Sequence, residues 1–118
     1  MAEQSVQKCY NQILERSTDK GGLTFWVNVL MNGKSVKDMV RSFAHSEEYR
    51  QRFILPYSPV EAAKLAYCHF LAREAESEAV ATGHANVLVN HGYAAMVKAF
   101  VDSVEYKNRF GDHLVPFK

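Results

Sequence analysis

The chain has 118 residues, of which 47% are hydrophobic, and this is enough for one packed domain and argues against disorder. Fourteen Lys and Arg against thirteen Asp and Glu leave a formal net charge of +1. A nearly neutral chain has no strong global field to attract nucleic acid or an anionic membrane, so charged contacts with a partner are expected to be local.

The amino terminus and the cysteines bear on localisation. The opening MAEQSVQK contains no hydrophobic signal region, and the longest apolar runs are only a few residues. The sequence therefore predicts no membrane insertion and no visible secretion. Cys9 and Cys68 lack C-x-x-C spacing, which suits a reducing compartment and leaves a single bridge between them as an alternative. We expect a soluble, intracellular protein.

The apolar residues recur with helical periodicity along the chain. Three stretches show it most clearly: Val6, Tyr10, Ile13 and Leu14; then Val36, Met39, Val40 and Phe43; then Met96, Val97, Phe100 and Val101. No segment alternates as a strand would. The sequence therefore predicts an all-α fold, a compact multi-helix domain.

Helix boundaries are marked by capping residues. Asp19 is expected to cap a helix that ends near Asn32-Gly33, and the Ser35-x-x-Asp38 pattern resembles a capping box. The clearest start is the segment 58–61, with Ser at the N-cap, Pro at the first helical position and Glu at the third.

One sequence segment occurs in two similar copies, as FAHSEEYRQRF over residues 43–53 and as FVDSVEYKNRF over residues 100–110. At the same offset of 57, without a gap, identical residues pair as Tyr10 with Tyr67, Leu14 with Leu71, Arg16 with Arg73, Met39 with Met96, Val40 with Val97, Phe43 with Phe100, Glu48 with Glu105 and Arg52 with Arg109. A tandem duplication explains this pattern. We predict one domain, residues 1–118, built from two similar halves at about 6–55 and 58–112 that pack on each other.

Each copy of this segment predicts a tight turn between two helices, which we call the first corner (residues 43–53) and the second corner (residues 100–110). Ser46 or Ser103 precedes a Glu and a Tyr, so it is expected to cap a short last helix. A nucleophilic serine is disfavoured because no histidine shares the spacing in both copies. Four aromatic residues at i, i+4 are expected to seal the corners into the core: Tyr49 with Phe53, and Tyr106 with Phe110.

Four motifs carry a resemblance to a known family. They are Y-x-x-F-L-x-R at 67–73, H-G-Y at 91–93, D-S-x-E-Y at 102–106 and the closing F-G-D-x-x-V-P-F at 110–117. With these motifs the chain resembles the linker-polypeptide domain of phycobilisomes over nearly all its length. It departs from the family at residues 72–75, where Gly-Arg-Ala-Pro is usual, and in being nearly neutral where these linkers are commonly strongly basic.

The resemblance implies a non-catalytic scaffold. Such a domain sits in the central cavity of phycobiliprotein rings, made of phycocyanin, allophycocyanin or phycoerythrin. It joins successive discs or attaches rods to the core, and it tunes the energies of the bound chromophores. The implied location is peripheral, in the phycobilisome on the cytoplasmic (stromal) face of the thylakoid membrane. Since such domains often belong to longer polypeptides, we expect this one to be an excised domain.

Two other interpretations stay open at the level of sequence. The D-x-x-G-L-x-x-W pattern from Asp19 to Trp26 is similar to a repeat of bacterial surface and secreted proteins, which favours a helical surface module. Adjacent Cys68 and His69 would suit an enzyme accessory domain. Phosphate loops, nucleophile elbows and paired-carboxylate motifs are missing from the sequence, so we expect no enzyme.

Candidate ligand-binding residues are few. His84 and His91 lie two turns apart, but zinc needs three or four convergent ligands, so no metal site is expected. Cys68 is the only weak candidate for covalent bilin attachment, and a cysteine at this place in a helix is more often a small buried hydrophobe, so neither attachment nor a cofactor is expected.

The candidate partner-binding residues are basic side chains near the corners and two aromatic side chains outside the helices. They are Arg41, Arg50, Arg52, Tyr57, Lys98, Arg109 and Phe117. The basic residues would dock onto an acidic partner. A solvated helix face is the simpler interpretation. Arg52 and Arg109 are also placed to form i, i+4 ion pairs with Glu48 and Glu105. Tyr57 and Phe117 would anchor an interface or cover the bundle.

Overall fold

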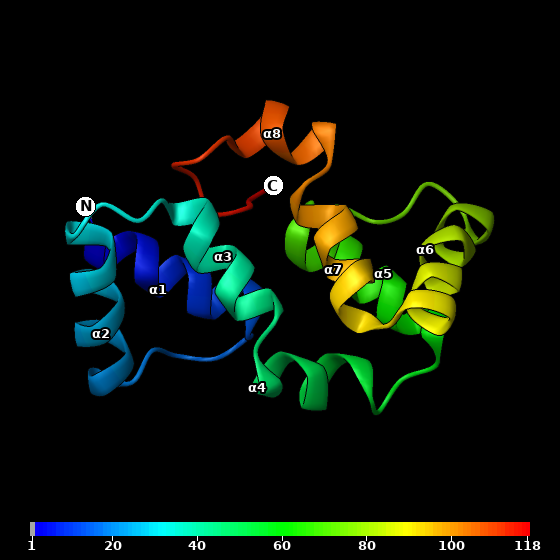
Figure 1. The fold of residues 1–118 in the computed structure, drawn as a ribbon, viewed down its shortest axis with the longest axis horizontal. Helices are drawn as coiled ribbons and strands as arrows, with labels where there is room; N and C mark the ends of the chain where they lie inside the picture. The colour runs from blue at the N-terminus through cyan, green and yellow to red at the C-terminus, as the bar shows by residue number, and fades with distance from the viewer. Residues whose placement is uncertain (1) are drawn as a thin grey trace.

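The computed structural model of the chain describes residues 2–118 (Figure 1). Its helices are α1 (Ala2–Ile13), α2 (Lys20–Met31), α3 (Val36–Ala44), α4 (Glu47–Tyr49), a π-helix η1 (Arg50–Ile54), α5 (Pro59–Phe70), α6 (Glu78–His91), α7 (Tyr93–Val101) and α8 (Val104–Phe110). Between Ala2 and Lys118 there is no strand. The all-α prediction is confirmed.

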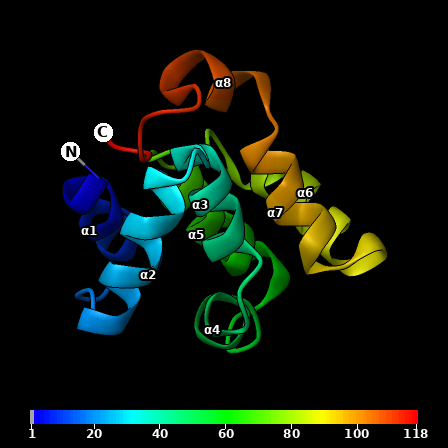
Figure 2. The ribbon, with the colours of Figure 1, turned by 60° about the vertical axis from the view of Figure 1, so that its left-hand side comes forward.

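The helices form two groups side by side along the longest axis of a molecule that measures 40 × 29 × 23 Å. Figure 1 shows α1, α2 and α3 at one end and α5, α6 and α7 at the other. The segment of α4 and η1 joins the groups on one side, and α8 lies on the opposite side. After α8 the carboxyl-terminal tail returns toward α1, which Figure 2 shows from a second direction.

Several helix bounds recur 57 residues apart. α1 and α5 both begin and end at equivalent positions, as do α3 and α7, and α4 begins where α8 does. The copies differ in two places: α6 runs beyond the equivalent of the end of α2, and the chain after Tyr49 continues as a π-helix whereas α8 remains an α-helix to Phe110.

The capping residues lie where the sequence predicts them. Asp19 Oδ1 accepts the N–H of Gly22 at 2.6 Å. Ser35 Oγ accepts the N–H of Asp38 at 3.0 Å, and the Asp38 carboxylate accepts from the N–H of Ser35, which completes the capping box. Ser58 Oγ accepts the N–H of Glu61 at the start of α5. These bonds satisfy amide groups that a helix start leaves without an intrahelical partner.

The same cap starts both corners. Ser46 Oγ accepts the N–H of Tyr49 at 3.1 Å, and Ser103 Oγ accepts that of Tyr106 at 3.1 Å. Each hydroxyl also donates to a carbonyl at the end of the preceding helix. Both serines are thus helix caps, as predicted.

All residues of the three predicted apolar stripes are buried, and so are the four corner aromatics. In each group a tyrosine meets a phenylalanine edge-on with ring centroids 4.8 Å apart: Tyr10 with Phe43, and Tyr67 with Phe100. Such contacts add to the gain from burying apolar area. The core therefore runs through both groups of helices.

Helix α2 is only partly covered. None of its residues is buried; Leu23, Trp26, Val27 and Leu30 pack partially on the core. Gly22 permits its close approach to α1, because a Cβ at this position would collide with the hydroxyl of Tyr10. That contact gives a packing reason for the glycine of the D-x-x-G-L-x-x-W pattern.

Candidate partner-binding surface

The first corner is held together by an ionic frame. Arg16 donates to the Glu48 carboxylate through both Nε, at 2.7 Å, and Nη2, at 3.0 Å. Arg52 donates to Glu48 at 3.1 Å and to the carbonyl of Leu14 at 2.5 Å. The hydrogen bond from Arg16 is the main reason why the pKa of Glu48 lies below its usual value. The frame ties the end of α1 to α4 and η1.

The second corner has an equivalent frame. Arg73 donates to Glu105 through Nε at 2.8 Å and Nη2 at 2.7 Å. Arg109 donates to Glu105 at 3.2 Å and to the carbonyl of Leu71. The pKa of Glu105 is lowered chiefly by its hydrogen bond to Arg73. Arg52 and Arg109, two predicted partner-binding residues, therefore both serve as internal ties.

Arg41 and Lys98 occupy equivalent positions of the two halves, and the structure brings them to one carboxylate. Asp102 lies 2.8 Å from Arg41 Nη2 and 3.1 Å from Lys98 Nζ. The hydrogen bond from Arg41, with a smaller contribution from Lys98, lowers the pKa of Asp102 to about 2. The contact joins α3 to the end of α7, and so connects the two groups of helices.

The remaining candidates are more exposed. Arg50 pairs with Glu47 at 2.9 Å on the outside of the corner. Tyr57 is 46% exposed, and Phe117 is 55% exposed with its ring 5.8 Å from that of Phe110. The carbonyl of Phe117 also accepts from Arg109 at 3.5 Å. Phe117 therefore lies beside the second corner.

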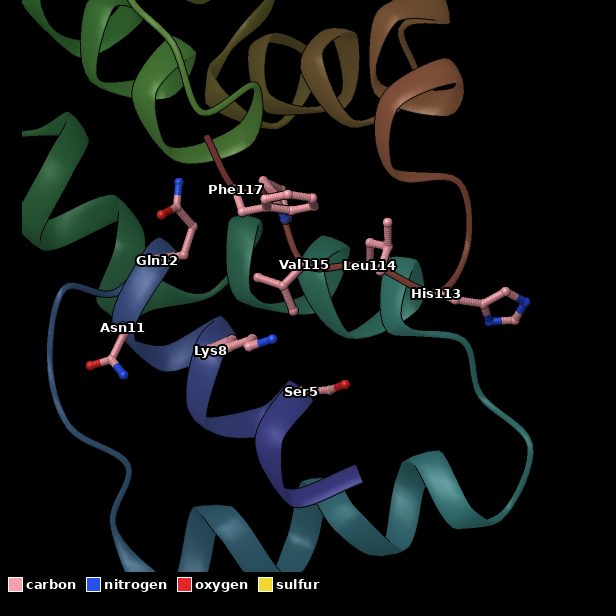
Figure 3. A pocket seen from close by; sticks show the side chains of 9 residues that line it. Ser5, Lys8, Asn11, Gln12, His113, Leu114, Val115 and Phe117 are labelled. Carbon is pink, nitrogen blue, oxygen red and sulfur yellow. The ribbon is translucent and has the colours of Figure 1, made fainter. Parts of the chain in front are cut away.

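A groove opens between α1 and the tail (Figure 3). It has a volume of about 480 Å³ and is lined by Ser5, Lys8, Asn11, Gln12 and the tail residues 113–117. In Figure 3, Ser5 and Lys8 extend from α1 toward the tail, and Phe117 and Leu114 border the other side. Of the predicted partner-binding residues, Phe117 is the one that lines it.

Two exposed helices complete the surface. On α2, Phe25 is 58% and Met31 75% exposed, and on α6 Val89 is 66% exposed. These helices lie at opposite ends of the molecule (Figure 1). Sequence reasoning missed α2 as a surface feature, although one signal was there: residues 21–33 contain no charge and are rich in large apolar side chains.

The candidate ligand-binding residues lie apart from one another. His84 stacks on Phe100 with ring centroids 4.2 Å apart, whereas His91 is exposed at the end of α6. Cys9 is buried and Cys68 partly buried, and burial raises the pKa of both thiols. Within residues 2–118, no three His, Cys, Asp or Glu side chains are grouped so that they could hold a metal ion.

Comparison with known proteins identifies the family. The sequence profile of the phycobilisome linker polypeptide matches residues 1–118. The chain belongs to the phycobilisome linker polypeptide family. This result does not favour the surface-repeat interpretation, and it agrees with the resemblance seen at the four sequence motifs.

Named relatives show how the chain relates to larger family members. It is 34% identical to a 39 kDa phycocyanin-associated rod linker polypeptide of Microchaete diplosiphon, over 95% of this chain and 40% of the relative. It is 32% identical to a 32.1 kDa phycocyanin-associated rod linker of Synechocystis, over 98% of this chain and 41% of the relative. The phycobiliprotein ApcE of Synechocystis is 33% identical, with 13% of its length covered. The chain thus spans less than half of each of these relatives.

The structure also bears on the membrane. None of the helices between residues 2 and 118 is long and apolar enough to cross a bilayer.

Proposed function

We propose that this chain is a non-catalytic linker domain that binds phycobiliprotein discs and organises them within the phycobilisome. The observation that carries the proposal is the family match, which extends over residues 1–118. The whole chain acts as one domain of two similar halves. Its partners are phycocyanin, allophycocyanin or phycoerythrin, and the two phycocyanin-associated relatives favour phycocyanin as the first to test.

The form of the surface supports a joining role. The exposed helices α2 and α6, in which Lys20 and Glu78 are the only Lys, Arg, Asp or Glu residues, lie at opposite ends of the longest axis, so two partner surfaces can contact the domain at once. Large exposed apolar side chains such as Phe25 and Met31 are typical of the centre of a protein interface. A domain with exposed apolar side chains at each end is suited to connecting two bodies.

Within this surface we place the contact residues in two classes. Tyr57 and Phe117 are proposed as aromatic anchors because both side chains are about half exposed. The polar rim consists of the basic candidates Arg41, Arg50, Arg52, Lys98 and Arg109. Each of them has an internal carboxylate partner, so its charge is partly neutralised before a phycobiliprotein binds. Polar and aromatic groups at such a surface would change the dielectric around a neighbouring bilin, which is how binding tunes energy transfer.

The proposed location follows from the partner. A domain bound to phycobiliprotein is peripheral, in the phycobilisome on the cytoplasmic (stromal) face of the thylakoid membrane. No cofactor of its own is needed for this role, and covalent bilin attachment at Cys68 is not proposed.

Sedimentation of the purified chain with each phycobiliprotein, in high phosphate, tests the proposal. We expect the chain to migrate with a bilin-absorbing particle larger than the phycobiliprotein forms alone in the same buffer, with emission shifted to the red. The variants Tyr57→Ala and Phe117→Ala should weaken this association, whereas Val104→Ala, which truncates an apolar side chain that is 73% exposed, is the matched control. Failure to associate with all three phycobiliproteins would refute the function.

A further inference from the structure

The groove between α1 and the tail continues beyond the part drawn in Figure 3. A second hollow, also of about 480 Å³, shares Ser5 and His113 with it and extends along Leu30 and Met31 to the start of α3 at Val36. Each volume is in the range of pockets that accept a small ligand or several side chains. The two hollows share these lining residues, and we take them together as one surface from Phe117 to Met31, which we call the tail groove.

The tail groove has an unbalanced charge. Neither Asp nor Glu appears among the side chains that line its two hollows, whereas Lys8 and Lys34 both do. Both lysines are exposed, and in the part of the chain that the structure describes neither forms an ion pair. All six arginines, in contrast, have an internal carboxylate partner. Lys8 and Lys34 therefore give this groove positive charge that no carboxylate lining it neutralises, whereas the arginines of the corners are paired.

The edges of the tail groove are apolar. Leu114 is 47% exposed, Phe117 55% and Met31 75%. Burying such side chains against a partner gains free energy in proportion to the apolar area removed from water, while the lysines would attract and orient carboxylates. The combination selects a segment that carries both acidic and apolar side chains.

We infer that the tail groove is the docking site for an acidic, partly apolar surface segment of the phycobiliprotein subunit that the chain binds. This inference rests on the proposed function and adds to it where contact is made and which charges the partner presents. The lysines act by charge: they raise the association rate and make the affinity fall with salt, because exposed ion pairs are screened. The apolar edges hold the complex once it has formed.

Charge reversal tests the inference on the whole chain. The double variant Lys8→Glu, Lys34→Glu is compared with Lys107→Glu, which reverses an exposed lysine of α8 that forms no ion pair within residues 2–118. Affinity for phycocyanin is measured between low and physiological salt, after circular dichroism has shown equal helix content and melting. We expect the double variant to bind about tenfold more weakly at low salt, with a flatter salt dependence.

The outcomes separate the two proposals. Binding by the original chain and by Lys107→Glu, with loss in the double variant, supports the tail groove. Equal affinity and equal salt dependence of all three proteins would overturn the groove while leaving the proposed function intact. If the original chain binds none of the three phycobiliproteins, the proposed function fails and the groove inference fails with it.

Discussion

The two corners of the molecule have the same ionic frame but different interiors. In each, an arginine three residues beyond the end of α1 or α5 donates to a glutamate through two nitrogens, and a second arginine donates both to that glutamate and to a backbone carbonyl. The backbone conformation is also the same in both corners. The residue before Arg16 and the residue before Arg73 both have a positive φ, 51° at Glu15 and 53° at Ala72. The duplicated sequence specifies this frame twice.

Inside the first corner lies a chain of hydrogen bonds. The hydroxyl of Tyr49 lies 2.8 Å from Nδ1 of His69, whose Nε2 lies 2.5 Å from Glu15 Oε2. Tyr49 and His69 are both buried. A carboxylate only accepts, so Nε2 donates to Glu15, and in the neutral imidazole Nδ1 then accepts from the Tyr49 hydroxyl.

The second corner lacks this chain. The buried hydroxyl of Tyr106 has no hydrogen-bond partner among residues 2–118. Position 72 is Ala where the first corner has Glu15, and the equivalent of His69 is Gln12, which donates to the carbonyls of Cys68 and His69 instead. The residues shared by both halves therefore fix the ionic frame, and the residues that differ fix the interior hydrogen bonds.

The largest expected effect is on the shared frame. Glu48→Ala and Glu105→Ala each remove the half-buried carboxylate that two arginines share, so each should lower the free energy of unfolding by about 2 kcal/mol. Urea denaturation of each variant and of the original chain measures this change in the free energy of unfolding. Glu47→Ala, which removes only the exposed pair with Arg50, is the control and should cost less than about 0.5 kcal/mol. A large difference between the first two variants would break the equivalence of the corners.

A smaller effect should separate the interiors. Tyr49→Phe leaves the buried Nδ1 of His69 without its donor and should cost about 1–2 kcal/mol. Tyr106→Phe removes a hydroxyl that has no partner in the described chain, so its free energy of unfolding should stay equal or rise slightly. Equal losses in the two variants, measured in the same urea series, would show that Tyr106 is hydrogen-bonded in solution.

The smallest effect is pH dependence confined to the first corner. Burial lowers the pKa of His69, and the hydrogen bond to Glu15 offsets part of this. In the unfolded chain the pKa of this histidine is about 6.5, so as the pH falls below this value the unfolded state takes up a proton more readily than the folded state. The free energy of unfolding therefore falls as the pH falls, by at most about 1.4 kcal/mol per pH unit.

The variant His69→Gln, which copies Gln12 of the other half, should remove this part of the pH dependence. His45 and His84, whose pKa values burial also lowers, stay in both proteins, so the difference between the two curves isolates His69. Unfolding curves at pH 7.5 and 5.5 provide the comparison. Parallel losses of stability in both proteins would show that His69 is not the responsible group.

Much of the fold could be predicted because its signals are local. The caps at Asp19, Ser35 and Ser58 and the apolar stripes depend on spacings of three or four residues, which the sequence displays directly. The burial of the corner aromatics followed from the same periodicity. The π-helix from Arg50 to Ile54 had no such signal, because its sequence closely repeats that of the α-helical second copy.

The site was less predictable because many of its contacts join residues that lie far apart in the sequence. Arg41 and Lys98 were recognised as basic candidates, but their convergence on Asp102 depends on how α3 packs beside α7. Arg16 and Arg73 were recognised as a repeated pair, and their role in gripping Glu48 and Glu105 needed the fold. The tail groove depends on where residues 113–117 return, which no local spacing encodes.

Cryo-electron microscopy of the chain assembled with phycocyanin would show whether this domain binds as a linker. We expect density for the helical domain inside the phycobiliprotein ring, with the tail groove against an acidic segment of a subunit and the α2 and α6 ends in contact with the ring. A ring whose central cavity is empty, or a chain attached only to its outer surface, would contradict this linker role.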